Sequence, residues 1–153
     1  MPDGTTTIDP PTVTATSTGG TDVVEAVAAR LESLVTSRTV YRRTVPKSPV
    51  ARYYLVTAAT GVTESYNLAD EPDYRAAPVW VTSVARGIDA AKAAEVADWG
   101  SVRAVDALTG WRATLGQATY RMTHVASGPP QRNDALTDFT VSYANQFNLS
   151  YQP

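Results

Sequence analysis

The segment from Pro78 to Leu108 constrains the fold most, because a strand pattern and a helix pattern follow each other across Gly87. From Pro78 to Ala85, apolar and β-branched residues occupy both alternating faces, which is typical of a central strand covered on both sides. A helix is then expected from Asp89 to about Leu108, with Gly100 as a candidate bend. The apolar residues that carry this helix pattern are Ala90, Ala94, Val96, Trp99, Val102, Val105 and Leu108.

A second amphipathic helix is predicted from Thr21 or Asp22 to about Ser37, because Asp22 and Glu25 have the spacing of a capping box. Segments rich in β-branched and aromatic residues predict the remaining strands. These are Thr39 to Thr44, Arg52 to Thr57, a further candidate at Val62 to Leu68, and then Thr119 to Ser127 and Leu136 to Leu149. An acidic loop is expected from Ala69 to Ala76.

These elements predict an α+β fold in the order αβββαββ, with a mixed, mainly antiparallel sheet flanked by two helices. Residues 1–20 are rich in Thr, Pro and Gly and are expected to form a flexible N-terminal arm. Residues 21–153 are expected to form one domain, since 153 residues is the usual size of a single core. No apolar run is long enough to cross a bilayer, and no signal peptide is recognisable, so a cytoplasmic site of synthesis is expected.

The residues needed for catalysis or metal binding are scarce. The chain has no cysteine and one histidine, His124, which lies in a predicted strand without a nucleophile motif nearby. The tightest acidic cluster, Asp70-Glu71-Pro72-Asp73, has no calcium-loop spacing and is better interpreted as a solvated loop than as a divalent-cation site. We therefore predict no catalytic residue, no metal and no cofactor.

Charges of opposite sign are segregated along the chain. Five basic residues and no acid lie between Ser37 and Tyr54, namely Arg38, Arg42, Arg43, Lys47 and Arg52. Four acids follow before Arg75, namely Glu64, Asp70, Glu71 and Asp73. The basic segment is open to three interpretations: a solvated edge, a charged protein interface, or a nucleic-acid surface with Tyr41, Tyr53 and Tyr54 as stacking faces. The acidic segment favours an interface in which the Arg42/Arg43 edge of one copy meets the acidic loop of the next.

The last predicted strand has an unusually aromatic end. Phe139, Val141 and Tyr143 are expected in the core. Phe147, Leu149 and Tyr151 either extend that core, which is the favoured interpretation, or dock onto a partner protein.

The order of elements and several short phrases resemble the tail terminator, or tail completion, proteins of long-tailed, siphovirus-type bacteriophages of actinobacteria. The resemblance covers about Val23 to Leu149. Its phrases are Val40-Tyr41-Arg42, Tyr53-Tyr54-Leu55-Val56, Val79-Trp80-Val81-Thr82-Ser83-Val84, Leu108-Thr109-Gly110-Trp111-Arg112 and Ser127-Gly128-Pro129-Pro130-Gln131-Arg132-Asn133-Asp134.

The resemblance implies a non-enzymatic virion protein at the junction of tail and neck. Such a subunit forms a homohexameric ring on the end of the tail tube, stops tube polymerisation and offers the head-tail joining surface. The implied partners are other copies of the chain, the major tail tube protein and the head-tail connector or neck protein, with DNA only passing through the lumen. The alternatives are a neck or head-completion protein of the same virion and a small cytoplasmic nucleic-acid-binding regulator.

Overall fold

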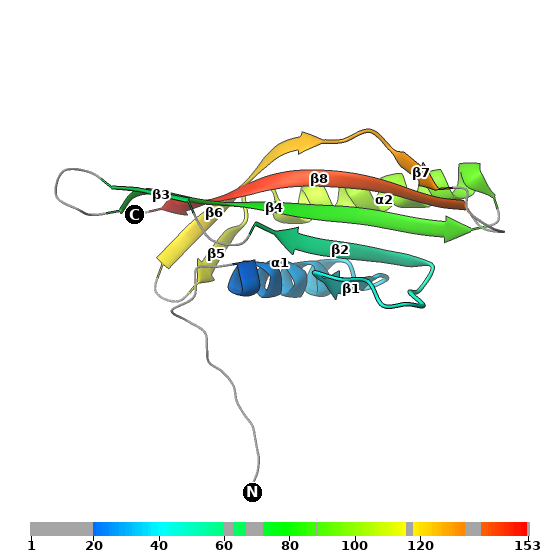
Figure 1. Cartoon of the computed structure of the whole chain (residues 1–153), viewed down its shortest axis with the longest axis horizontal. Helices are drawn as coiled ribbons and strands as arrows, with labels where there is room; N and C mark the ends of the chain where they lie inside the picture. Colours follow the sequence, from blue (N-terminus) through cyan, green and yellow to red (C-terminus); the bar gives the residue numbers. More distant parts are fainter. Residues whose placement is uncertain are drawn as a thin grey trace, which may run out of the picture.

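The computed structural model describes residues 20–59, 63–66, 72–87, 89–115, 118–133 and 139–152. These residues form two helices and an eight-stranded sheet (Figure 1). The α+β class, the mixed sheet and the predicted order of helices and strands are confirmed. The predicted N-terminal arm lies outside the described residues, apart from Gly20, at which the first helix begins.

The elements run in two blocks, each a helix followed by strands. Helix α1 is Gly20–Leu34, and it precedes β1 (Thr39–Arg42), β2 (Arg52–Ala58), β3 (Thr63–Tyr66) and β4 (Pro72–Gly87). Helix α2 is Ala90–Leu108, and it precedes β5 (Arg112–Leu115), β6 (Ala118–Ser127), β7 (Gln131–Asn133) and β8 (Phe139–Gln152). Asp89 caps α2, because its Oδ1 accepts hydrogen bonds from Ala91 N at 2.9 Å and Lys92 N at 3.3 Å. Gly100 does not interrupt the helix.

The sheet has the strand order β1-β2-β4-β8-β6-β5, with β3 paired to β4 and β7 paired to β8. Only the β1–β2 pair is parallel among these described pairs; the others are antiparallel. Strands β4 and β8 form the centre of the sheet and pair from Ala76↔Ser150 to Gly87↔Phe139. The prediction that residues 78–85 form a central strand is therefore confirmed.

Three features of the strands differ from the sequence prediction. Strand β4 begins at Pro72, so the second half of the predicted acidic loop is strand, held by pairing with β3. Strands β5 and β7 were not predicted, because they are only four and three residues long. Such short segments have too few residues to show a period.

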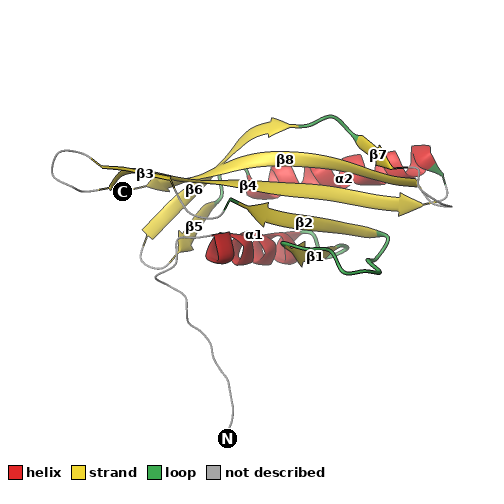
Figure 2. Ribbon diagram, viewed as in Figure 1, coloured by secondary structure: helices red, strands yellow, loops and turns green. Residues whose placement is uncertain are grey.

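Both helices pack on one face of the sheet (red in Figure 2), where α1 covers β1 and β2 and α2 covers β4 and β8. One cluster of buried apolar residues joins the helices to this face. Its largest members include Tyr54, Phe147, Leu31, Leu108, Met122 and Leu149. The opposite face of β4 carries half-buried Trp80 and Thr82 and buried Val84, and no described helix covers it. The expectation that both faces are covered is thus met fully on the face under the helices and in part on the other.

Helix α2 presents its small residues to the sheet. Its buried positions are Ala93, Ala97, Gly100, Ser101, Ala104, Ala107 and Leu108. The large side chains of Trp99 and Val102, which carried the predicted helix pattern, are 45% and 53% exposed. Leu108, another residue of that pattern, is fully buried. The pattern therefore predicted the buried end of the helix but not its middle, where only small residues fit close to the sheet.

Candidate interaction site

A buried arginine joins α2 to the rest of the molecule. Arg38 follows α1 and is 6% exposed. Its Nη2 donates a 2.5 Å hydrogen bond to Val96 O, and its Nη1 donates to Ser83 Oγ at 3.1 Å. Burial lowers the pKa of Arg38, and the neighbouring positive charge of Arg52 lowers it further, while Tyr54 opposes the shift. Two like charges therefore lie close together at this point of the fold.

Two strand residues complete this attachment of α2. Ser83 Oγ donates to Ala97 O at 2.7 Å, and Tyr54 OH donates to Gly100 O at 2.6 Å. Each helix carbonyl has a second lone pair, so it accepts these bonds in addition to its bond within the helix. Burial raises the pKa of Tyr54 to about 12.

A groove opens beside this attachment, between α2 and the ends of β2 and β4. It consists of two adjoining cavities of about 300 Å³ and 310 Å³, whose walls share Arg52 and Val96. The first is lined by Ser37, Arg38, Arg52, Glu95, Val96 and Trp99; the second by Arg52, Ala85, Arg86, Gly87, Asp89, Lys92, Ala93 and Val96. We call the two together the Arg52 groove.

The chemistry of the Arg52 groove is basic and aromatic. Four cations and two carboxylates line it. Both carboxylates already have partners within the chain. Asp89 caps α2, and Glu95 forms an ion pair with Lys92 at an Nζ–Oε1 distance of 3.1 Å. Trp99 lies 5.6 Å from the guanidinium carbon of Arg38, which is cation–π distance, and remains half exposed. The groove therefore suits an acidic ligand that also carries aromatic or proline residues.

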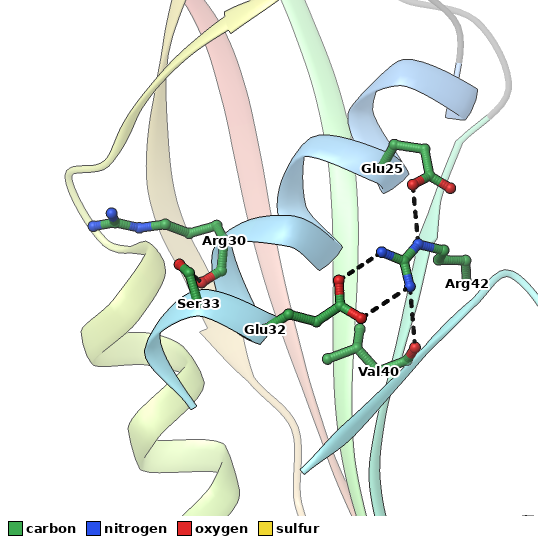
Figure 3. A network of polar contacts seen from close by, with 6 residues as sticks. All are labelled: Glu25, Arg30, Glu32, Ser33, Val40 and Arg42. Carbon is green, nitrogen blue, oxygen red and sulfur yellow. Dashed lines mark hydrogen bonds and ion pairs between the residues drawn. The ribbon is translucent and has the colours of Figure 1, made fainter. Parts of the chain in front are cut away.

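Arg42, one of the predicted interface residues, forms ion pairs within its own chain. Its Nε donates to Glu25 Oε2 at 3.0 Å, and its Nη2 donates to Glu32 Oε1 at 2.7 Å (Figure 3). Arg42 thus attaches β1 to α1 within one chain. The hypothesis that Arg42 contacts a neighbour stays a prediction, and the glutamates that pair with Arg42 within the chain come from the preceding helix.

The other predicted interface residues are spread over the molecule, and Arg43 lies beside Val56 in β2. Arg43 is exposed with a positive φ of 67°, Lys47 is exposed, and Arg52 lies in the groove. Glu64 lies in β3 and Asp73 in β4, at the opposite end from the groove. Asp70 and Glu71 fall outside the described residues. The structure thus does not bring the two charge groups together within one chain.

The aromatic end of β8 belongs to the core, as the favoured interpretation held. Phe147 and Leu149 are both fully buried. Their side chains face α1, α2 and β6 in the main cluster. Contact of Phe147 and Leu149 with a tube or connector protein is therefore corrected. Tyr151 lies in β8, but its side chain is outside the description.

His124 takes part in a polar chain that differs from a catalytic triad. Its Nε2 lies 3.0 Å from Ser127 Oγ, and Ser127 Oγ donates to Asn145 Oδ1 at 2.6 Å. Asn145 in turn donates to Ser101 Oγ at 2.9 Å. Which of His124 and Ser127 donates in the first of these contacts depends on the tautomer of the imidazole. This chain connects β6, β8 and α2.

Two further properties concern only the residues that the structure describes. No group of three or more His, Asp or Glu side chains gathers there in a way that could hold a metal ion. No helix in those ranges is long and apolar enough to cross a membrane.

The comparisons with known proteins rest on structure. No family model and no curated protein matches the sequence. The fold is similar to that of a solved chain from the virion of a native gene transfer agent particle, with a TM-score of 0.56 and 14% identity over 86% of this chain and 95% of that one. A second solved chain, whose name states no function, has a TM-score of 0.57 and 19% identity over 86% of this chain and 96% of that one. At these identities the similarity shows the fold.

Sequence reasoning missed the groove. Arg38 was counted as one of five surface cations, whereas it is buried beneath α2. Gly100 was considered as a bend, whereas it provides space for Arg38 and Ser83. A glycine in the middle of an otherwise alanine-rich helix was the available signal of such a close approach.

Proposed function

We propose that this chain is a structural virion protein that caps the tail tube of a phage-like particle as a tail terminator. The observation that carries this proposal is the similarity of fold, along nearly the full length of both chains, to a chain of a gene transfer agent virion. The phrases that resemble tail terminators, such as Tyr53-Tyr54-Leu55-Val56 in β2, independently indicate the same class of protein.

In this proposal the chain forms a ring at the tail-neck junction, ends tube polymerisation and joins the tail to the head. The homohexameric state and the partners, which are the tail tube protein and the connector or neck protein, come from the resemblance. A ring requires unlike surfaces on the two flanks of each subunit. The exposed cations Arg43, Lys47 and Arg52 and the acidic segment of Glu64, Asp70, Glu71 and Asp73 are the candidate pair.

The nucleic-acid-binding alternative loses support from the described contacts. Of the five basic residues between Ser37 and Tyr54, Arg38 is buried and Arg42 is paired with two glutamates. Nucleic-acid affinity depends on many cations that are free to contact phosphates. Three exposed cations at a distance from an acidic segment of the same chain favour a protein interface between copies instead.

The test is the mass of the purified chain in solution by light scattering, alone and with the tail tube subunit of the same particle. We expect a closed ring, or a complex that forms on tube ends, and electron micrographs in which added protein stops tube growth. Binding to the neck protein without any effect on tube length would favour the neck-protein alternative. A monomer that ignores the tube subunit and binds DNA in low salt would overturn the proposal.

A further inference from the structure

The acidic segment and the Arg52 groove lie at opposite ends of β4. Strand β3 pairs with Pro72–Ala76 at the start of β4, whereas Arg52 pairs with Ala85 near its end. At about 3.3 Å per residue, Asp73 and Ala85 are separated by about 40 Å along the strand. Because β4 is paired on both sides over most of its length, it cannot fold back. The acidic segment of one chain therefore cannot reach its own groove.

The β3–β4 hairpin projects beyond the packed part of the molecule. The pairing of β8 with β4 stops at Ala76, so among the described pairs the first residues of β4 are paired by β3 alone. Among the described elements, β3 packs substantially against β4 alone, and Figure 1 shows the hairpin extending from the end of the sheet away from α2. Besides its four acids, the segment from Thr63 to Ala76 contains Tyr66, Pro72 and Tyr74.

The groove has the complementary chemistry. Arg52 is exposed and lies near the buried charge of Arg38, and the mutual repulsion of the two guanidinium groups is relieved when a carboxylate comes between them. Trp99 beside them lies at cation–π distance from both Arg38 and Arg103, and the exposed part of its ring suits contact with tyrosine or proline side chains. A segment with clustered carboxylates, two tyrosines and a proline meets both requirements.

We propose that the acidic β3–β4 hairpin of a second copy docks in the Arg52 groove, where its carboxylates face Arg52 and its tyrosine and proline residues face Trp99. The contact is heterologous, because different surfaces of the two copies meet, and repeating it closes a ring or continues as a filament. This assignment deepens the proposed function and rests on it. It replaces Arg42 by Arg52 as the principal cation of the interface.

The absence of cysteine from the chain allows a direct test. A variant with both Ser37→Cys and Ser65→Cys, which keeps every charged residue of the proposed contact, is assembled and mildly oxidised; Ser37 lines the groove and Ser65 lies in β3. A disulfide requires Cα atoms within about 7 Å, so these two positions cannot join within one chain. We expect a ladder of covalent oligomers on a non-reducing gel, up to the full ring. Each single-cysteine variant should give no ladder, because one thiol per chain cannot extend a covalent series.

The matched control moves only the cysteine of the groove. Ser48 is also an exposed serine of the basic segment, but it lies outside the groove. The variant with Ser48→Cys and Ser65→Cys should give no ladder. An equally strong ladder from this control, or assembled rings of the first variant that do not cross-link, would overturn the docking while leaving the proposed function intact.

Charge reversal gives a second, independent measurement on the assembled protein. Arg52→Glu should raise the concentration needed for assembly by about tenfold or more. Arg43→Glu should raise it much less, and Arg52→Glu combined with Asp73→Arg should recover part of the loss. Equal effects of Arg52→Glu and Arg43→Glu would refute the groove as the site. A wild-type chain that stays monomeric with and without the tube subunit would refute both proposals.

Discussion

The guanidinium of Arg38 lies directly against Gly100 in one turn of α2, in the space that a side chain at that position would fill. A Cβ atom added at Gly100 would overlap the guanidinium and Ser83 Oγ. The same turn supplies Gly100 O as the acceptor for Tyr54 OH at 2.6 Å. Gly100 and Arg38 thus set how closely α2 approaches the sheet, and the wall of the Arg52 groove depends on them.

Gly100→Ala should destabilise the protein although alanine favours helices. Helix propensity alone predicts a gain of about 1 kcal/mol. The added methyl group forces Arg38 out of its hydrogen bonds to Val96 O and Ser83 Oγ, so we expect a net loss of about 1–3 kcal/mol. Urea unfolding followed by circular dichroism measures the difference. Val102→Ala on the exposed side of α2 is the control and should change the stability by less than about 0.5 kcal/mol. Increased stability of Gly100→Ala would contradict the close contact.

The cost of Gly100→Ala should depend on Arg38. In an Arg38→Ala background the space next to Gly100 is larger, so the second substitution should cost little. The coupling energy from the double-mutant cycle should be about 1–2 kcal/mol. Arg43→Ala, which removes an exposed arginine, should leave the cost of Gly100→Ala unchanged. Strictly additive effects of Arg38→Ala and Gly100→Ala would show that the two residues do not constrain each other.

Glu32→Gln should reduce the stability near neutral pH and have less effect in acid. The hydrogen bond from Arg42 lowers the pKa of Glu32 below its usual 4.5, against a smaller opposing effect of burial. A depressed pKa stabilises the fold above the unfolded value and the stabilisation is lost as pH falls through the folded value. Because Glu32 is 46% exposed, we expect only a few tenths of a kcal/mol. Unfolding midpoints of wild type and Glu32→Gln should therefore converge below pH 4.5. Asp106→Asn, which removes an exposed carboxylate with no ion pair among the described contacts, is the control.

The sequence predicted those parts of the fold in which the residues of the apolar pattern are also the residues that become buried. Of the residues that carry its amphipathic pattern, helix α1 buries Val24, Val27 and Leu31 and exposes Leu34 at its end. Strand β4 lies at the centre as its alternation indicates. For α2 the agreement is partial. Leu108 is buried as its pattern indicates, but Trp99 and Val102 point outward, and the other buried positions of the helix are small residues. Tertiary hydrogen bonds, which leave no periodic trace in the sequence, hold this small face against the sheet.

The charge pattern correctly separated a basic segment from an acidic one, but it did not predict which of the basic residues are exposed and unpaired. A run of cations predicts a basic surface, but it does not reveal that Arg42 pairs with glutamates of the preceding helix or that Arg38 is buried. Those partners lie on other elements and depend on the packing angle of α1. Arg52 and Trp99 come together for the same reason, since a loop, a strand and a helix that are distant in sequence form the groove.

Tyr54→Phe should lower the stability at neutral pH. It should also make the protein less sensitive to alkaline pH than wild type. The phenol donates to Gly100 O in the core, so its deletion should cost about 1 kcal/mol. Burial raises the pKa of Tyr54 from 10.0 to about 12. A raised pKa means that the folded state holds the proton longer than the unfolded state, so the stabilisation is complete below pH 10 and is lost as pH rises toward 12. Unfolding free energies measured across this window should fall more steeply for wild type than for Tyr54→Phe. Tyr143→Phe on the half-buried part of β8 serves as the control, and a slope that Tyr143→Phe flattens as much as Tyr54→Phe would assign the effect to another tyrosine.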